Sequence, residues 1–317
     1  MRTRVEKVVI AGDGTRLYAR QTAGRDAAGA PLICANGIGV STFFWRYLED
    51  HFSASRPVIV WDYRGHGQSE FPRDLDGLTM EACADDLRRV LDAFGHERGV
   101  LLGHSMGCQV IYTFAHHHPE RAAMLVPMLG TYGRPVHTFF NMEVASLASF
   151  VVGHRVGVTM PEALARVKHR LIDSPRGRRV VSAIARLGRI VHPTAMKQAD
   201  LDAYLDHMAE QSPLVFFRMA EKMAAHSAGP FLEQITAPTL IVAGEWDLFT
   251  PLSLSEEIAD RLPNSRLLVL REGSHAALVE QPDLIHRELE RFLVEHPVDA
   301  VETDEDEEES LPTAAVA

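Results

Sequence analysis

The pattern Gly-x-Ser-x-Gly at residues 103–107 constrains the fold of this 317-residue chain more than any other feature. The residues before it, 99–102, form a short apolar run that predicts a buried strand, and residues 110–115 follow with helical periodicity. A serine at so sharp a strand-to-helix turn has a strained backbone, and a Cβ at either flanking glycine would collide with neighbouring backbone. The turn therefore predicts an exposed serine hydroxyl at a helix N-terminus, where positive partial charge favours an anion.

Two further residues extend the argument from this serine. A serine hydroxyl is a poor nucleophile unless a base takes its proton and an acid orients that base. Asp247 follows the apolar run 238–243, and His275 follows the apolar run 266–270. Among the sixteen histidines, His275 alone stands between the last predicted strand and a C-terminal helix predicted at 282–295. We therefore predict a nucleophile, an acid and a base in the chain order serine, aspartate, histidine.

With these residues in this order, the chain resembles the serine α/β-hydrolases over residues 5–295. The resemblance implies an α/β fold with a mostly parallel eight-stranded sheet flanked by helices, and an all-helical cap inserted into it. It also implies that the backbone N–H groups of Ile38 and Met106 form an oxyanion hole, because Asn36-Gly37-Ile38 stands where the family has His-Gly-x. Backbone donors do not depend on the side chain at position 36, so the asparagine leaves the expected hole intact.

The alternation of strands and helices stops in the middle of the chain. Residues 1–131 and 230–297 alternate apolar runs with amphipathic segments, which predicts two parts of one core. Residues 132–229 have a helical pattern throughout and correspond to the implied cap. Within the first part, Asp62 and Arg64 predict an ion pair inside one loop. Helices in the cap are expected at 139–152, 161–173, 177–191 and 199–226, the last broken near Pro213.

The predicted cap supplies most of the candidates for substrate contact. It is rich in phenylalanine and methionine, whose flat or flexible side chains suit an apolar pocket of variable shape. The same side chains are equally suited to packing the cap onto the core. The cap is also basic between residues 166 and 189, which indicates either a solvated face or an anionic partner. The candidate substrate-binding residues are Asn36, Phe139, Phe140 and Phe216.

We therefore expect a serine hydrolase that cleaves a carboxylic ester of a fairly apolar small molecule through an acyl-enzyme. The residues leave open a lactonase, a thioesterase, a C–C bond hydrolase, a perhydrolase or an acyltransferase that uses the same three side chains. Dehalogenases and epoxide hydrolases of this fold use an aspartate nucleophile, so Ser105 disfavours those reactions. A non-catalytic binding module is a further alternative, which the complete set of three residues disfavours. The expected mechanism needs no metal and no cofactor.

Charge and composition limit which partners the chain is expected to bind. The net charge is −11, and the segment 298–317 contributes eight of the acidic residues. Such a block repels itself and predicts a disordered tail, which is either a solubilising extension or a site for a basic partner. The rest of the chain is mildly acidic, so no nucleic-acid partner is expected. The sequence leaves the oligomeric state open.

The cysteines and the apolar runs predict a compartment. Three cysteines without metal-binding spacing indicate buried thiols in a reducing environment. The N-terminus has no apolar segment of the kind that secretory signals contain. The longest apolar stretch, residues 144–153, is about half of the ~20 residues that a spanning helix needs. We expect a cytoplasmic protein without a transmembrane segment.

Overall fold

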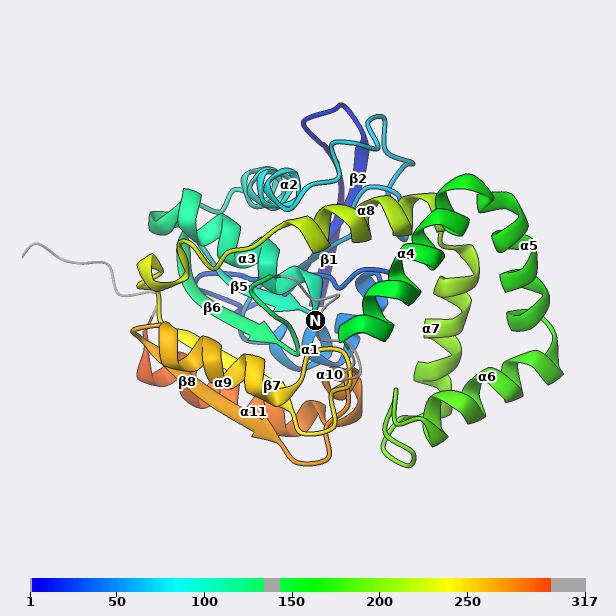
Figure 1. The fold of residues 1–317 in the computed structure, drawn as a ribbon. Helices are drawn as coiled ribbons and strands as arrows, with labels where there is room; N and C mark the ends of the chain where they lie inside the picture. Colours follow the sequence, from blue (N-terminus) through cyan, green and yellow to red (C-terminus); the bar gives the residue numbers. More distant parts are fainter. Residues whose placement is uncertain (1, 134–142, 298–317) are drawn as a thin grey trace, which may run out of the picture.

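Eight strands form one sheet in the computed structural model, which describes residues 2–133 and 143–297 (Figure 1). The first two strands form a hairpin, with Ile10 of the first strand opposite Arg16 of the second. The strands are β1 (Arg2–Ile10), β2 (Arg16–Gly24), β3 (Leu32–Ala35), β4 (Val58–Trp61), β5 (Gly99–His104), β6 (Ala122–Met128), β7 (Thr239–Gly244) and β8 (Ser265–Leu270).

The strand order is β1-β2-β4-β3-β5-β6-β7-β8. β2 pairs antiparallel with both β1 and β4, and every later pair is parallel. Parallel neighbours need a crossover connection, which the helices between the strands provide. The carboxyl ends of β3 to β8 therefore lie along one edge of the sheet, which confirms the predicted α/β-hydrolase architecture.

Helices cover both faces of the sheet, and each face has its own apolar core. All residues of β3, β4, β5, β6 and β7 are buried, as expected for parallel strands covered on two sides. Alternate residues point to opposite faces, so Leu101 belongs to one core and Leu102 to the other. The core helices are α1 (Arg46–Phe52), α2 (Met80–Ala93), α3 (Met106–His117), α9 (Leu252–Arg261), α10 (Ala277–Glu280) and α11 (Pro282–Glu295), with short 3₁₀ turns η1 (Thr42–Trp45), η2 (Pro119–Arg121) and η5 (Leu232–Gln234).

Between β6 and β7 the chain forms the helices α4 (Glu143–Thr159), α5 (Pro161–Ile172), α6 (Pro175–Leu187), α7 (Gln198–Glu210) and α8 (Pro213–Ala225), together called the α4–α8 segment. In Figure 1, α4 to α7 stand beside the sheet and α8 leads back toward it. A β-bridge between Gly133 and Ser227 joins the two ends of this excursion. The last predicted helical stretch is two helices because Pro213, which cannot continue α7, starts α8.

The predicted ion pair between Asp62 and Arg64 is wrong. The Arg64 guanidinium donates instead to both carboxylate oxygens of Asp86 on α2, each at 2.8 Å. Asp62 accepts backbone N–H groups from Thr42 at 2.9 Å and Gln68 at 3.0 Å. A carboxylate satisfied by backbone N–H groups needs no cation, so the arginine is free to reach the neighbouring helix.

The three cysteines, Cys34, Cys83 and Cys108, are buried and form no disulfide, which confirms the predicted burial of the thiols. Within residues 2–133 and 143–297, no helix is both long and apolar enough to cross a membrane. The acidic segment 298–317, for which a basic partner is one of the two expectations, lies outside the described residues.

Candidate active site

Ser105 lies on the sharp turn that joins β5 to α3. Its φ of 54° and ψ of −115° belong to a region that residues other than glycine rarely adopt. The surrounding backbone is too close for side chains: a Cβ on Gly103 would lie 2.5 Å from the Gly107 oxygen, and one on Gly107 would lie 2.2 Å from the Ala35 oxygen. The turn therefore has the form that the sequence predicts, with Ser105 at the N-terminus of α3.

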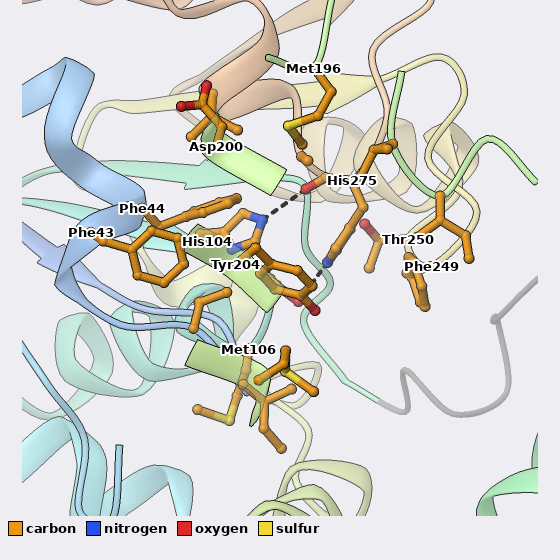
Figure 2. Close-up of a pocket in the computed structure, with 18 of the residues that line it drawn as sticks. Phe43, Phe44, His104, Met106, Met196, Asp200, Tyr204, Phe249, Thr250 and His275 are labelled. Carbon is orange, nitrogen blue, oxygen red and sulfur yellow. Dashed lines mark hydrogen bonds between the residues drawn. The ribbon is translucent and has the colours of Figure 1, made fainter. Parts of the chain in front are cut away.

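Three side chains from distant parts of the chain meet at this turn. His275, which follows β8, lies with Nε2 3.0 Å from the Ser105 hydroxyl (Figure 2). Its Nδ1 lies 2.8 Å from Asp247 Oδ2. Asp247, which follows β7, also accepts backbone N–H groups from Phe249 and Thr250, and the Thr250 hydroxyl at 2.7 Å. The carboxylate is thus fixed from two sides, and it orients the imidazole toward the serine.

The electrostatics of the buried carboxylate favour its charged form. Burial raises the pKa of Asp247, but the charge of His275 and hydrogen bonds from His275 and Thr250 outweigh burial, so this pKa lies below its ordinary value. The side chain is fully buried, whereas that of His275 is 18% exposed. An ionised acid beside a partly open imidazole stabilises the cation that forms when His275 takes a proton.

His104, immediately before the serine, is a buried neutral ring. Burial, together with repulsion from His275, lowers the pKa of His104 to about 3. Its Nε2 lies 3.0 Å from the backbone oxygen of His275, so this nitrogen carries the hydrogen and donates it. Figure 2 shows this bond tying the loop that bears His275 to the end of β5.

The loop after β3 runs directly beside the serine. A Cβ on Gly37 would lie 3.1 Å from the Ser105 Cβ, and both Ile38 and Met106 line the cavity described below. The Asn36 amide is turned away into the core: Nδ2 donates to the backbone oxygen of Trp61 at 2.6 Å, and Oδ1 accepts Trp45 Nε1–H at 2.7 Å. Asn36 thus lies outside the cavity lining and holds the loop in place.

A cavity of about 220 Å³ opens beside the Ser105 hydroxyl. It is smaller than the ~300–1,000 Å³ typical of ligand pockets. Its walls are mostly apolar, and the α4–α8 segment and the stretch between α6 and α7 supply part of them, including Met196, Met208, Phe216 and Met223. The predicted residue Phe216 is thus at the cavity, whereas Phe139 and Phe140 lie outside the described residues.

Sequence reasoning did not identify an ion pair in the cavity wall. Arg46, at the start of α1, pairs with Asp200 of α7, and Tyr47 also donates to that carboxylate at 3.0 Å. Figure 2 shows Asp200 on the same side of the cavity as Phe43 and Phe44. The two charged residues are far apart in the sequence, and neither belongs to a recognisable motif, so no signal pointed to their contact.

Gln109, which the sequence analysis also passed over, lines the cavity one helical turn after Ser105. The available signal in the sequence was a polar amide within the apolar run of α3, but such a residue is also compatible with an ordinary position on a helix. Within the described ranges, no group of three or more histidine, cysteine, aspartate or glutamate side chains is placed to hold a metal ion.

Comparison with known proteins identifies the fold family. The sequence profile described as alpha/beta hydrolase fold matches residues 30–282. A Bacillus subtilis protein, provisionally named a 2-succinyl-6-hydroxy-2,4-cyclohexadiene-1-carboxylate synthase, is 28% identical over 90% of this chain and 97% of its own length. Epoxide hydrolase 4 of Mus musculus is 25% identical over 84% of this chain and 74% of that protein.

Solved structures are similar over nearly the whole chain. A thermophilic esterase from Thermogutta terrifontis superposes with a TM-score of 0.70 at 23% identity, covering 94% of this chain and 100% of the other. The enol-lactonase from Burkholderia xenovorans superposes with a TM-score of 0.72 at 20% identity, covering 92% and 100%. At these identities the likeness concerns the fold.

Proposed function

The chain belongs to the alpha/beta hydrolase fold family, and on that premise we propose that it is a serine hydrolase that cleaves carboxylic esters of small, largely apolar molecules. The observation that carries the proposal is the hydrogen-bonded series from Ser105 through His275 to Asp247, with distances of 3.0 and 2.8 Å. A nucleophile, a base and an orienting acid in this geometry are what acyl transfer through a serine requires.

In the proposed reaction His275 Nε2 takes the proton of Ser105 as the serine oxygen attacks the acyl carbonyl. Asp247 holds the imidazole with Nδ1–H toward the carboxylate and stabilises the imidazolium. The tetrahedral intermediate collapses when His275 gives the proton to the departing alcohol. A water molecule activated by the same imidazole then attacks the acyl-enzyme and releases the acid.

The negative charge of the intermediate develops on the former carbonyl oxygen, and hydrogen-bond donors close to that oxygen are required to stabilise it. We assign this role to the backbone N–H groups of Ile38 and Met106, which line the cavity next to the serine. Met106 is the first residue of α3, so the partial positive charge of the helix N-terminus adds to its effect. Losing one such donor typically costs about 3 kcal/mol of transition-state stabilisation.

Ser105 supports ester cleavage over epoxide opening, although an epoxide hydrolase is among the relatives. Enzymes of this fold that open epoxides use an aspartate at the nucleophile position, and this chain has a serine there. The apolar lining supports an apolar acyl or alcohol group, and the cavity volume supports a short one. In this proposal residues 132–229 act as a cap that controls access to the cavity.

The proposal is tested by hydrolysis of p-nitrophenyl esters from acetyl to palmitoyl, with Ser105→Ala beside the wild type. We expect the fastest turnover with short acyl chains, and a loss of at least about 10⁴-fold in kcat for the variant. A fluorophosphonate should label the wild-type serine and spare the variant. Full activity of Ser105→Ala would refute the proposal.

A further inference from the structure

Glu280, the last residue of α10, is a buried acid that the proposed reaction does not use. The Ser274 hydroxyl lies 2.9 Å from each of its carboxylate oxygens, and the backbone N–H of His192 donates to Oε1 at 2.6 Å. Burial raises the pKa of Glu280, and these hydrogen bonds oppose burial only in part. The fold therefore holds this carboxylate at a cost in stability, which points to a role of another kind.

The serine that bonds to Glu280 closes the turn that carries His275. The Ser274 hydroxyl oxygen accepts the backbone N–H of Ala276 at 3.1 Å, so one hydroxyl spans the histidine. A hydroxyl has one hydrogen to donate and two lone pairs that accept. When its hydrogen points to the carboxylate of Glu280, a lone pair is left to face Ala276. The carboxylate thus orients the hydroxyl, and the hydroxyl fixes the backbone on both sides of the imidazole.

The same carboxylate joins this turn to the stretch between α6 and α7, which forms part of the cavity wall. His192 in that stretch donates its N–H to Glu280, and its neighbours Ile190 and Val191 line the cavity. One buried carboxylate therefore holds a segment of the cavity wall against the turn that carries the proposed base.

Side chains of this stretch also contact the loop of the proposed acid. Trp246 precedes Asp247, and the His192 ring stacks on its indole with centroids 5.5 Å apart. The Arg189 guanidinium lies 4.3 Å from the centroid of the same indole. Residues 189–192 thus reach the loops of both the acid and the base, and the bond to the base side is made through a single acceptor group.

We propose that Glu280 is a positioning residue for His275. Through the Ser274 hydroxyl it keeps the imidazole directed at Ser105, and through the N–H of His192 it ties that placement to the cavity wall. This inference rests on the proposed function. A displacement of about 1 Å at a reacting group can lower a rate by about 100-fold. Loss of the carboxylate should therefore lower kcat more than it weakens substrate binding.

The role assigned to Glu280 is hydrogen bonding and not charge. Glutamine has the same length, and its oxygen can accept from both Ser274 and His192 while its N–H donates to the second lone pair of the serine. Leucine has a similar volume and no acceptor. The two substitutions therefore separate loss of the charge from loss of the acceptors.

Glu280→Leu and Glu280→Gln are compared with wild type on p-nitrophenyl acetate and hexanoate. For Glu280→Leu we expect kcat to fall by about 10- to 100-fold while KM changes by less than about threefold, and fluorophosphonate labelling of Ser105 to slow by a similar factor. Glu280→Gln should keep kcat and the labelling rate within about threefold of wild type. A wild-type kcat in Glu280→Leu, or equal losses in both variants, would overturn the inference.

Leu289→Ala is the matched control for a loss of stability alone. Leu289 is fully buried in α11, the helix that follows Glu280, and its truncation leaves a cavity without removing a polar contact. The variant should unfold at a lower temperature than wild type and keep kcat within about twofold at room temperature. If kcat fell in step with the unfolding temperature across both variants, the role of Glu280 would be structural and the inference would fail.

Ser274→Ala tests the same contact from the other partner, whether or not Glu280→Leu folds. We expect kcat to fall by about 10-fold or more, because the turn loses the hydroxyl that closes it. The double variant with Glu280→Leu should lose no more activity than Glu280→Leu alone, since both changes break one contact. Losses that multiply, or a wild-type kcat in Ser274→Ala, would show that Glu280 does not act through Ser274.

A proton resonance separates failure of this inference from failure of the proposed function. The Nδ1 proton that His275 shares with Asp247 should give a downfield ¹H signal, which His275→Ala assigns. Glu280→Leu should shift or broaden this signal, and Glu280→Gln should preserve it. A wild type that neither hydrolyses the esters nor reacts with the fluorophosphonate would contradict the hydrolase proposal alone. A signal and a kcat that Glu280→Leu leaves unchanged would contradict the role of Glu280 alone.

Discussion

The glycines that flank Ser105 lie against backbone atoms, whereas Gly153 of α4 lies against a side chain. A Cβ on Gly107, next to the serine turn, would lie 2.2 Å from a backbone oxygen of Ala35. A Cβ on Gly153 in α4 would meet the ring of Phe217 first, at 3.2 Å. Backbone cannot move aside without displacing a strand, but a ring can rotate. The turn that carries Ser105 is thus closely confined by backbone, while the contact between α4 and Phe217 can adjust by rotation of the ring.

The two regions also differ in how much apolar surface they expose. The inner strands β3 to β7 are buried throughout, whereas α4 to α6 expose large apolar side chains such as Val152, Ile184 and Leu187. Methionines from the α4–α8 segment line the cavity, and methionine adapts its shape more readily than other apolar residues. A fixed catalytic edge and an adaptable wall suit an enzyme whose specificity can change while its chemistry does not.

The largest effect on activity is expected at the edge of the sheet that carries the proposed catalytic residues. Asp247→Asn should lower kcat by about 10⁴-fold, because the amide no longer holds His275 with its Nε2 free to accept the serine proton. Ester hydrolysis at pH 7 measures the loss, and circular dichroism checks that the fold persists. A loss of less than tenfold would mean that the buried carboxylate is structural only.

Two glycine substitutions compare the regions directly. Gly107→Ala should destabilise the protein by about 3 kcal/mol or more, because the added methyl group overlaps the Ala35 carbonyl. Gly153→Ala should change the stability by no more than about 1 kcal/mol, since the gain in helix propensity offsets a small shift of Phe217. Denaturant unfolding measures both. Similar values for the two variants would remove the proposed difference between the regions.

The boundary between the regions should be sensitive to acid. Burial lowers the pKa of His207 in α7 to about 4, and repulsion from His66 and Lys168 adds to this effect. The unfolded chain takes up a proton near pH 6.5 and the folded one does not, so this histidine makes stability fall as the pH drops from about 6.5 toward 4. At pH 5 the loss amounts to about 2 kcal/mol relative to pH 7.

The variant His207→Gln isolates that contribution. The difference in free energy of unfolding between pH 7 and pH 5 should shrink by about 2 kcal/mol relative to wild type. Comparing each protein with itself at two pH values cancels any loss that the substitution causes at both. An unchanged difference would show that His207 titrates in the folded protein as it does in the unfolded chain.

The smallest effect is expected on the outer surface of α6. Leu187 is 86% exposed, so Leu187→Gln should change the stability by less than about 0.5 kcal/mol. Leu102→Ala in the fully buried strand β5 should cost about 2–5 kcal/mol. Thermal unfolding of the two variants gives the contrast. A substantial loss for Leu187→Gln would indicate that this face of α6 is covered in solution.

Much of the fold could be predicted because its signals are local. Continuous apolar runs identified the inner strands, and the helix 282–295 was predicted with the bounds that the structure has. The meeting of Ser105, Asp247 and His275 was also predictable, because each lies at or shortly after the end of a parallel strand and those strand ends share one edge. No detailed contact was needed to place them.

Contacts between side chains far apart in the sequence could not be predicted in this way. Arg64 was assigned to its loop neighbour Asp62, but it reaches Asp86 on α2. The sequence does not reveal which of several nearby carboxylates already has donors. The pairing of Arg46 with Asp200 was hidden for the same reason, since the two residues are far apart in the sequence.

The order of the strands has a consequence for how the chain folds. β6 and β7 are neighbours, yet residues 129–238 separate them, so the sheet closes only after a long loop is brought together. The entropy of closing a flexible loop grows with the logarithm of its length, and doubling the length costs only about 0.6 kcal/mol. Lengthening or shortening the α4–α8 segment would therefore change the free energy of pairing β6 with β7 very little. The sheet can accept helical insertions of different lengths between β6 and β7, provided that the ends near Gly133 and Ser227 still meet.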